Sequence, residues 1–336
     1  MRNRFTFLLV LAIALLVGVA PVYGNIVINP FYETSLTSLA GAAAIESTIL
    51  SAISFYESTI STNITVNIAF GNMTSGLGES ITYISTGTYL SYITALHAVS
   101  SGDATDTTAL AGLPITATNP VNGGTTITAK VADLQAVGLL PSTPQGGADP
   151  CAGLAGTFAS CIQVNSSITS PPNGLAGNYG LLGVVEHEMD EALGLGSGLS
   201  SGVVGNPAPE DLFRYTAGGA RSYSLNPQLD EACTGAPKAF FSLNGTTDLQ
   251  TFNNCNNGGD YGDWLSPSSP PAVQDAFGTT GVSPSLTATS PPVVALDAIG
   301  YNLVPSAVPE PTSIFLLGTS MLIAGLIARR RLNLGR

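Results

Sequence analysis

One segment of the chain, residues 184–196, holds the side chains best suited to chemistry. It reads VVEHEMDEALGLG and contains His187, one of only two histidines in the protein. The apolar residues around it have helical spacing, so we expect a helix on which His187 and Glu191 lie four residues apart on one face. An imidazole and a carboxylate so placed could hold one metal ion, with Glu188 beside them as a base that acts on a water molecule.

The elements that must position this helix read as a mixture of helices and strands. The expected helices are residues 38–61, 88–99, 131–138 and 292–301, and the expected strands are residues 64–70, 81–84, 125–131 and 156–164. Loops rich in glycine and proline fill most of the chain after the motif helix. The pattern predicts an α+β fold with a mixed, twisted sheet and a loop-rich C-terminal subdomain. The second histidine, His97, is expected to be structural.

Charge is sparse and unevenly distributed along the chain. Six of the ten basic residues lie in the two ends, so the middle has four basic residues against 21 acids, a formal charge of −17. A body this acidic excludes nucleic-acid binding through phosphate contacts and could attract cations such as calcium. Solubility is the simpler explanation of the same charge.

The N-terminal end reads as a secretory signal peptide over residues 1–24. Arg2 and Arg4 precede an apolar run, and small residues near Gly24 offer a cleavage site. A permanent N-terminal membrane anchor is the alternative. The part of the chain that would remain outside the membrane, the ectodomain, is expected to span residues 25–305 without a further domain boundary.

The C-terminal end, residues 306–336, has three parts in order. A Val-Pro-Glu-Pro motif precedes an apolar span of transmembrane type from Ile314 to Ala328, and three arginines follow. This tail closely resembles the PEP-CTERM sorting signal of Gram-negative bacteria. The resemblance implies an exosortase-type sorting enzyme as partner, a stay in the inner membrane before processing, and release to the cell surface or extracellular matrix. A simple C-terminal membrane anchor is the alternative.

The four cysteines agree with export into an oxidising compartment. Two of them flank one Gly-rich segment and two flank another. Four cysteines allow three pairings, between which the sequence alone does not choose, and closure of short loops favours Cys151–Cys161 and Cys233–Cys255. A zinc site built from all four cysteines is the alternative, although the CxxC spacing of such sites is missing.

The motif helix resembles the zinc-binding helix of metzincin peptidases, whose pattern is HExxHxxGxxH. His187, Glu188 and Gly194 match this pattern, whereas Glu191 and Ser197 stand where the second and third histidines would be. The resemblance implies a zincin-like fold and a zinc metalloendopeptidase that acts on a protein or peptide. The methionine turn of metzincins is absent.

Three later segments extend this resemblance to exported bacterial metalloprotease-like proteins that pair an HExxE helix with a PEP-CTERM tail. They are DLFRY at residues 211–215, GDYGDW at residues 259–264 and ALDAIGY at residues 295–301. The likeness spans most of the ectodomain and is diffuse between these segments.

The remaining site residues are expected among the later acids and tyrosines. Asp211 is the expected third metal ligand, with the adjacent Glu210 and the distant Asp297 as alternatives. Zinc is the expected ion, and calcium stays open because a set with one imidazole and two carboxylates also suits a harder metal. Tyr215 is the expected hydrogen-bond donor to the oxyanion, an expectation from residue type alone.

A second function class fits the same sequence. A noncatalytic extracellular matrix or cell-surface protein on a degenerate zincin-like fold would share the acidic loops and the sorting tail. A carbohydrate-binding module ranks third, because such a module needs exposed aromatic side chains and Trp264 is the only tryptophan. Convergence of His187, Glu191 and one distant acid at an open cleft would favour the enzyme.

Overall fold

The structure is a computed structural model that describes residues 24–173, 176–200, 203–224, 238–305, 319–321 and 329–330. The chain separates into two compact units, Met1–Leu303 and Val304–Arg336, and the elements below belong to the first unit. The predicted signal peptide and the apolar span of the sorting tail lie almost wholly outside the described residues. Within the described residues, no helix has the length and apolar character needed to cross a membrane.

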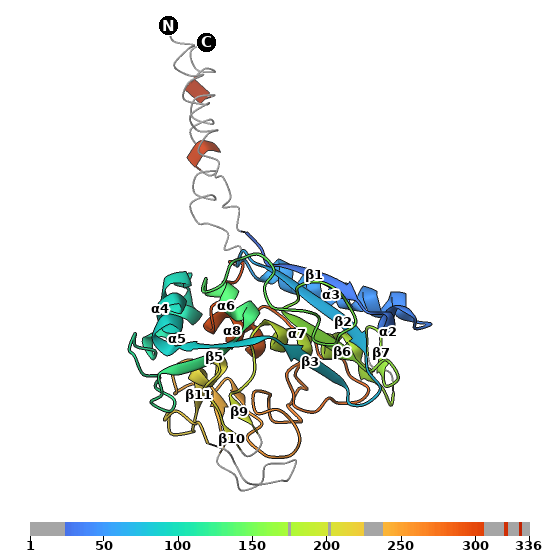
Figure 1. Ribbon diagram of the computed structural model, residues 1–336. Helices are drawn as coiled ribbons and strands as arrows, with labels where there is room; N and C mark the ends of the chain where they lie inside the picture. The colour runs from blue at the N-terminus through green and yellow to red at the C-terminus, as the bar shows by residue number, and fades with distance from the viewer. Residues whose placement is uncertain are drawn as a thin grey trace. The chain divides into compact units, whose positions relative to one another are not determined.

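A four-stranded mixed sheet runs through the first unit (Figure 1). Its strands lie in the order β1 (Val27–Tyr32), β2 (Thr65–Asn72), β6 (Ser160–Val164) and β3 (Gly78–Thr82). The first three strands are parallel, and β3 pairs antiparallel with β6. Parallel and antiparallel pairing in one sheet, together with the helices, confirms the expected α+β class and mixed sheet.

Two helices, α3 (Ala42–Thr59) and α7 (Leu181–Leu193), contact each other and the sheet. The apolar face of α3 is buried, as its helical spacing predicts. Tyr56 of α3 reaches α7, where its hydroxyl lies 2.9 Å from Asp190 Oδ1 and 2.8 Å from the carbonyl oxygen of Glu186. The motif helix α7 is therefore a core element with almost every side chain buried.

The other elements are short. They are α2 (Thr34–Thr37), β4 (Ile84–Thr88), α4 (Tyr89–Val99), α5 (Ala104–Ala111), β5 (Thr126–Lys130), α6 (Val131–Ala136), β7 (Thr169–Ser170), β8 (Tyr179–Gly180), β9 (Leu199–Ser200), β10 (Val203–Val204), a 3₁₀ helix (Pro209–Phe213), β11 (Arg214–Tyr215), β12 (Phe240–Phe241), β13 (Gln250–Thr251) and α8 (Pro291–Ala298). Between α7 and α8 the described chain holds only two-residue strands and the 3₁₀ turn, in keeping with a loop-rich C-terminal part.

Strand β1 and helix α5 are among the elements that the sequence did not predict, and each has a physical reason. Strand β1 contains Pro30, which argues against a central strand but is tolerated because β1 lies at an edge of the sheet. Helix α5 is rich in threonine and aspartate, which are weak helix formers. It begins at Asp103, whose side chain caps the helix by accepting a hydrogen bond from Asp106 N at 2.9 Å.

The predicted disulfide between Cys151 and Cys161 is present, with the two Cα atoms 6.0 Å apart. Cys255 is also disulfide-bonded, and its predicted partner Cys233 lies outside the described residues. No cysteine in the described part of the chain is free.

Candidate metal centre

The end of the motif helix is fixed by helix α8. Gly194 follows the last residue of helix α7, and a Cβ atom there would come within 2.7 Å of Ile299 Cδ1. Tyr301 donates a hydrogen bond of 2.7 Å to the carbonyl oxygen of Leu193. Because glycine lets Ile299 approach this closely, the chain just after α8 packs against α7 and holds its last turn in place.

Three side chains converge on one point at the exposed side of α7. His187 Nε2 lies 3.8 Å from Glu191 Oε1 and 3.7 Å from Asp263 Oδ1. Ligand atoms of the three residues all lie within 4.8 Å of one another. Two atoms bound to one zinc ion can be at most roughly 4.2 Å apart, so both histidine–carboxylate separations leave room for an ion between them.

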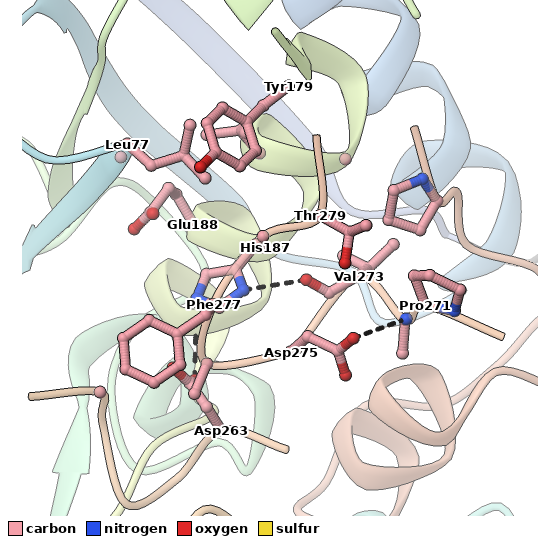
Figure 2. Close-up of a pocket in the computed structure, with 18 of the residues that line it drawn as sticks. Leu77, Tyr179, His187, Glu188, Asp263, Pro271, Val273, Asp275, Phe277 and Thr279 are labelled. Atoms are coloured by element: carbon pink, nitrogen blue, oxygen red, sulfur yellow. Dashed lines mark hydrogen bonds and ion pairs between the residues drawn. The ribbon is translucent and has the colours of Figure 1, made fainter. Parts of the chain in front are cut away.

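The imidazole of His187 is oriented for metal binding. Its Nδ1 lies 2.9 Å from the carbonyl oxygen of Val273, which can only accept a hydrogen bond. Nδ1 therefore carries a proton, and Nε2 is the ring nitrogen that faces the two carboxylates and could bind a metal ion once its own proton has left. Figure 2 shows the ring between Val273 on one side and Asp263 on another.

The two carboxylates are also held by neighbours. Ser80 of β3 donates a hydrogen bond of 2.6 Å to Glu191 Oε2, which leaves Oε1 on the side of His187. Gln274 Nε2 donates a hydrogen bond of 2.9 Å to Asp263 Oδ1. Outer contacts of this kind orient the ligands of protein metal sites.

A buried aromatic anchor brings Asp263 to the helix. Its neighbour Trp264 is fully buried against two phenylalanine rings, with ring centroids 5.0 Å and 5.6 Å away. The buried guanidinium of Arg214 donates a hydrogen bond of 2.6 Å to the carbonyl oxygen of Tyr261 in the same loop. The DLFRY and GDYGDW segments thus meet, and together they fix the position of Asp263.

Glu188 lies next to this cluster and faces the same cavity. The cavity measures about 520 Å³, and His187, Glu191 and Asp263 line it together with Glu188. Strand β3 approaches Glu188 at Gly78, where any Cβ atom would overlap Oε1 of the glutamate. Glycine at this position lets the strand and the carboxylate share the wall of the cavity.

The carboxylates around His187 outnumber the positive charges there, and the pKa values of these groups are shifted accordingly. Burial lowers the pKa of His187, but three surrounding carboxylates, led by Asp263, raise it to about 10. Burial raises the pKa of Asp263 to about 7. Burial, and then the neighbouring Glu191 carboxylate, raise the pKa of Glu188 well above its usual range. A divalent cation would supply the charge that protons otherwise provide.

The structure places Asp211 and Glu210 away from the cluster. Asp211 accepts hydrogen bonds from Ser197 Oγ at 2.6 Å and from two backbone N–H groups. Glu210 accepts a hydrogen bond of 2.6 Å from Gly196 N. Both acids hold the loop that follows α7, and Asp263 occupies the position expected for Asp211.

Three other residues singled out in the sequence also lie elsewhere. Tyr215 is absent from the cavity wall and stacks under Arg221, whose guanidinium carbon lies 4.6 Å from the ring centroid. Asp297 groups with Asp103 and Asp106. His97 Nε2 lies 2.8 Å from the carbonyl oxygen of Leu113, which agrees with the structural role expected for it.

Comparisons of the chain with protein-family models, with curated proteins and with solved structures give no match. The chemistry of the cluster therefore has to be judged from its own atoms. Three protein ligands with one side open to a cavity are typical of a catalytic zinc site, whereas structural zinc sites have four protein ligands. The adjacent carboxyl of Glu188 adds a proton acceptor at that open side.

Proposed function

We propose that the protein is an exported, metal-dependent endopeptidase with a zincin-like fold. The observation that carries this proposal is the convergence of His187, Glu191 and Asp263 beside Glu188 at the wall of one cavity. The resemblance of the motif helix to metzincins supports it. Zinc is the ion that we expect, because the imidazole and the three-ligand arrangement suit it.

Each residue then has a defined role in peptide hydrolysis. His187, Glu191 and Asp263 would hold the ion, which would supply Lewis acidity toward a peptide carbonyl and a water molecule. Glu188 takes a proton from the attacking water and returns it to the leaving amine. Tyr215 has no part in this proposal, because it lies off the cavity wall.

The shape of the site suits an extended peptide. A second cavity of about 450 Å³ lies beside the first, and Ser80, Glu191 and Asp260 line both. Ser80 belongs to β3, which forms an edge of the four-stranded sheet. Edge strands present unpaired backbone groups that an extended chain can pair with. The two cavities would accommodate peptide on either side of the scissile bond.

Cleavage of unfolded casein by the purified full chain tests this function. We expect hydrolysis that stops when a chelator such as 1,10-phenanthroline removes the metal and returns when zinc is added back. The non-chelating isomer 1,7-phenanthroline is the control and should leave cleavage unchanged. Absence of cleavage under all of these conditions, with metal bound, would favour a noncatalytic surface or matrix protein on the same fold.

Export and processing form a separate part of the proposal. Because both ends of the chain have the form of targeting signals, we expect the mature protein to begin near Asn25 and to end near Pro311. Mass spectrometry of material secreted by a PEP-CTERM-competent bacterium gives both ends. A full-length, membrane-bound chain as the sole species would contradict this part and leave the peptidase assignment untouched.

A further inference from the structure

A second acidic cluster lies apart from the proposed peptidase site, between helices α5 and α8. Its members are Asp103, Asp106 and Asp297, and one oxygen of each lies within 4.8 Å of the others. Asp103 and Asp106 stand at the start of α5, whereas Asp297 comes from α8. None of the three lines the cavities around His187. The two helices contact each other along the chain segments that carry these acids.

Asp297 is the member of this cluster that needs an explanation. Only 1% of the residue is exposed, yet neither carboxylate oxygen accepts a hydrogen bond of ordinary geometry from any residue in the described part of the chain. Thr105 and Asp103 are its polar neighbours. A buried carboxylate without partners is costly, and native proteins rarely keep one without a function or an unseen ligand.

The two acids of α5 are oriented toward the same point. Asp106 accepts hydrogen bonds through Oδ2 from Ser101 Oγ at 2.9 Å and from Gly102 N at 3.2 Å. Asp103 accepts one through Oδ1 from Asp106 N. In each carboxylate these contacts involve one oxygen, so the other can face Asp297.

We propose that Asp103, Asp106 and Asp297 form a calcium-binding site that ties α5 to α8. The set is made of oxygen alone, which hard cations prefer. Calcium binds oxygen at roughly 2.4 Å, so two oxygens on one ion lie at most about 4.8 Å apart. Asp103 is exposed, which leaves one side of the site open to the water ligands that complete calcium coordination. Burial and the neighbouring acids Asp103 and Asp106 raise the pKa of Asp297 to about 8, in keeping with a carboxylate that lacks a counter-charge.

The position of the site gives the ion a structural role. Ile299 and Tyr301, which follow directly after α8, support the last turn of the motif helix. An ion that joins α8 to α5 would therefore stabilise the support of the peptidase site without touching substrate. The proposed calcium site is independent of the proposed catalytic metal site, because the two sites share no residue.

Thermal unfolding of the purified full chain in calcium-free buffer and in millimolar CaCl₂ tests this proposal. We expect calcium to raise the melting temperature of the wild type by about 5 °C, and magnesium to give a much smaller shift. Asp297→Asn should abolish the response. Asp103→Asn should shift the response to at least about tenfold higher calcium, because asparagine keeps the helix cap but lacks the charge.

Two controls separate this site from other acids and from the catalytic metal. Asp248→Asn removes an exposed carboxylate from a loop and should keep the full response. His187→Ala should also keep it, since it alters only the other metal site. A wild type whose melting temperature is the same with and without calcium would overturn the proposal and indicate a proton shared between Asp297 and Asp103. An equal shift with magnesium, or an unchanged response in Asp297→Asn, would overturn it as well.

Discussion

Glu188→Gln should retain the metal and lose peptide hydrolysis, with kcat lower by about 10²–10⁴-fold. The amide has the shape of the carboxyl but cannot take a proton from water at neutral pH. Glu188 is not part of the group of three residues that hold the ion, so metal content should not change. Steady-state cleavage of casein, together with metal analysis of the same preparation, measures both quantities.

A matched substitution controls for the loss of a buried acid in the same helix. Glu186 is also buried in α7, but its carboxylate accepts a hydrogen bond of 3.0 Å from Leu286 N, and it lines neither described cavity. Glu186→Gln should change stability and leave kcat within about threefold of the wild type. Hydrolysis by Glu188→Gln at the wild-type rate would remove Glu188 from the mechanism.

Asp263→Asn should weaken zinc binding by at least about 100-fold, since a ligand contributes more than the outer contacts whose loss costs 10–100-fold. Asp211→Asn is its matched comparison, because both acids are buried, both lie after α7 and both accept hydrogen bonds. Asp211→Asn should bind zinc as the wild type does. It should unfold at a lower temperature, because its carboxylate holds the loop around Ser197 through backbone N–H groups.

Competition with a chromophoric zinc chelator gives the affinity of each variant, and circular dichroism confirms that each is folded. The result that would contradict the structure is the reverse pattern, in which Asp211→Asn loses zinc and Asp263→Asn keeps it. Tyr215→Phe serves as a second comparison and should cleave casein at the wild-type rate, because Tyr215 lies off the cavity wall.

Of the three residues in the candidate cluster, the sequence pointed to His187 and Glu191 and did not point to Asp263. His187 and Glu191 are four residues apart on one helix, so their proximity depends only on helix geometry. The proposed third ligand, Asp263, is brought to the helix by loop packing, whereas nearness in sequence had favoured Asp211. The Asp211 carboxylate instead accepts hydrogen bonds from nearby backbone N–H groups, as acids beside turns commonly do.

A signal for Asp263 was nevertheless present in the chain. The GDYGDW segment places this acid beside Trp264, the only tryptophan, in a stretch otherwise rich in glycine, asparagine and aspartate. A large aromatic residue in such a loop is an anchor, and its neighbours are held in place with it. The contact between this loop and Arg214 could not be predicted, because it joins two irregular segments without periodicity.

The fold was likewise predicted where it depends on local sequence patterns and missed where it depends on long-range contacts. Periodic segments such as α4, β2 and β5 begin and end close to their predicted bounds. Strand β3 was predicted only in part, because its glycine and polar residues give a weak strand pattern. Its place at the edge of the sheet, beside the motif helix, follows from antiparallel pairing with β6. That pairing depends on long-range contacts, which a single sequence does not reveal.

Metal analysis of the purified full chain tests directly whether the cluster of His187, Glu191 and Asp263 binds zinc. Inductively coupled plasma mass spectrometry, after dialysis against zinc at low concentration and then against metal-free buffer, should find one zinc ion per wild-type chain. His187→Ala should hold less than about a tenth of that amount, because carboxylates alone bind zinc weakly. A wild type without stoichiometric zinc or another transition metal, or a His187→Ala variant that holds as much as the wild type, would contradict the metal site and the peptidase function with it.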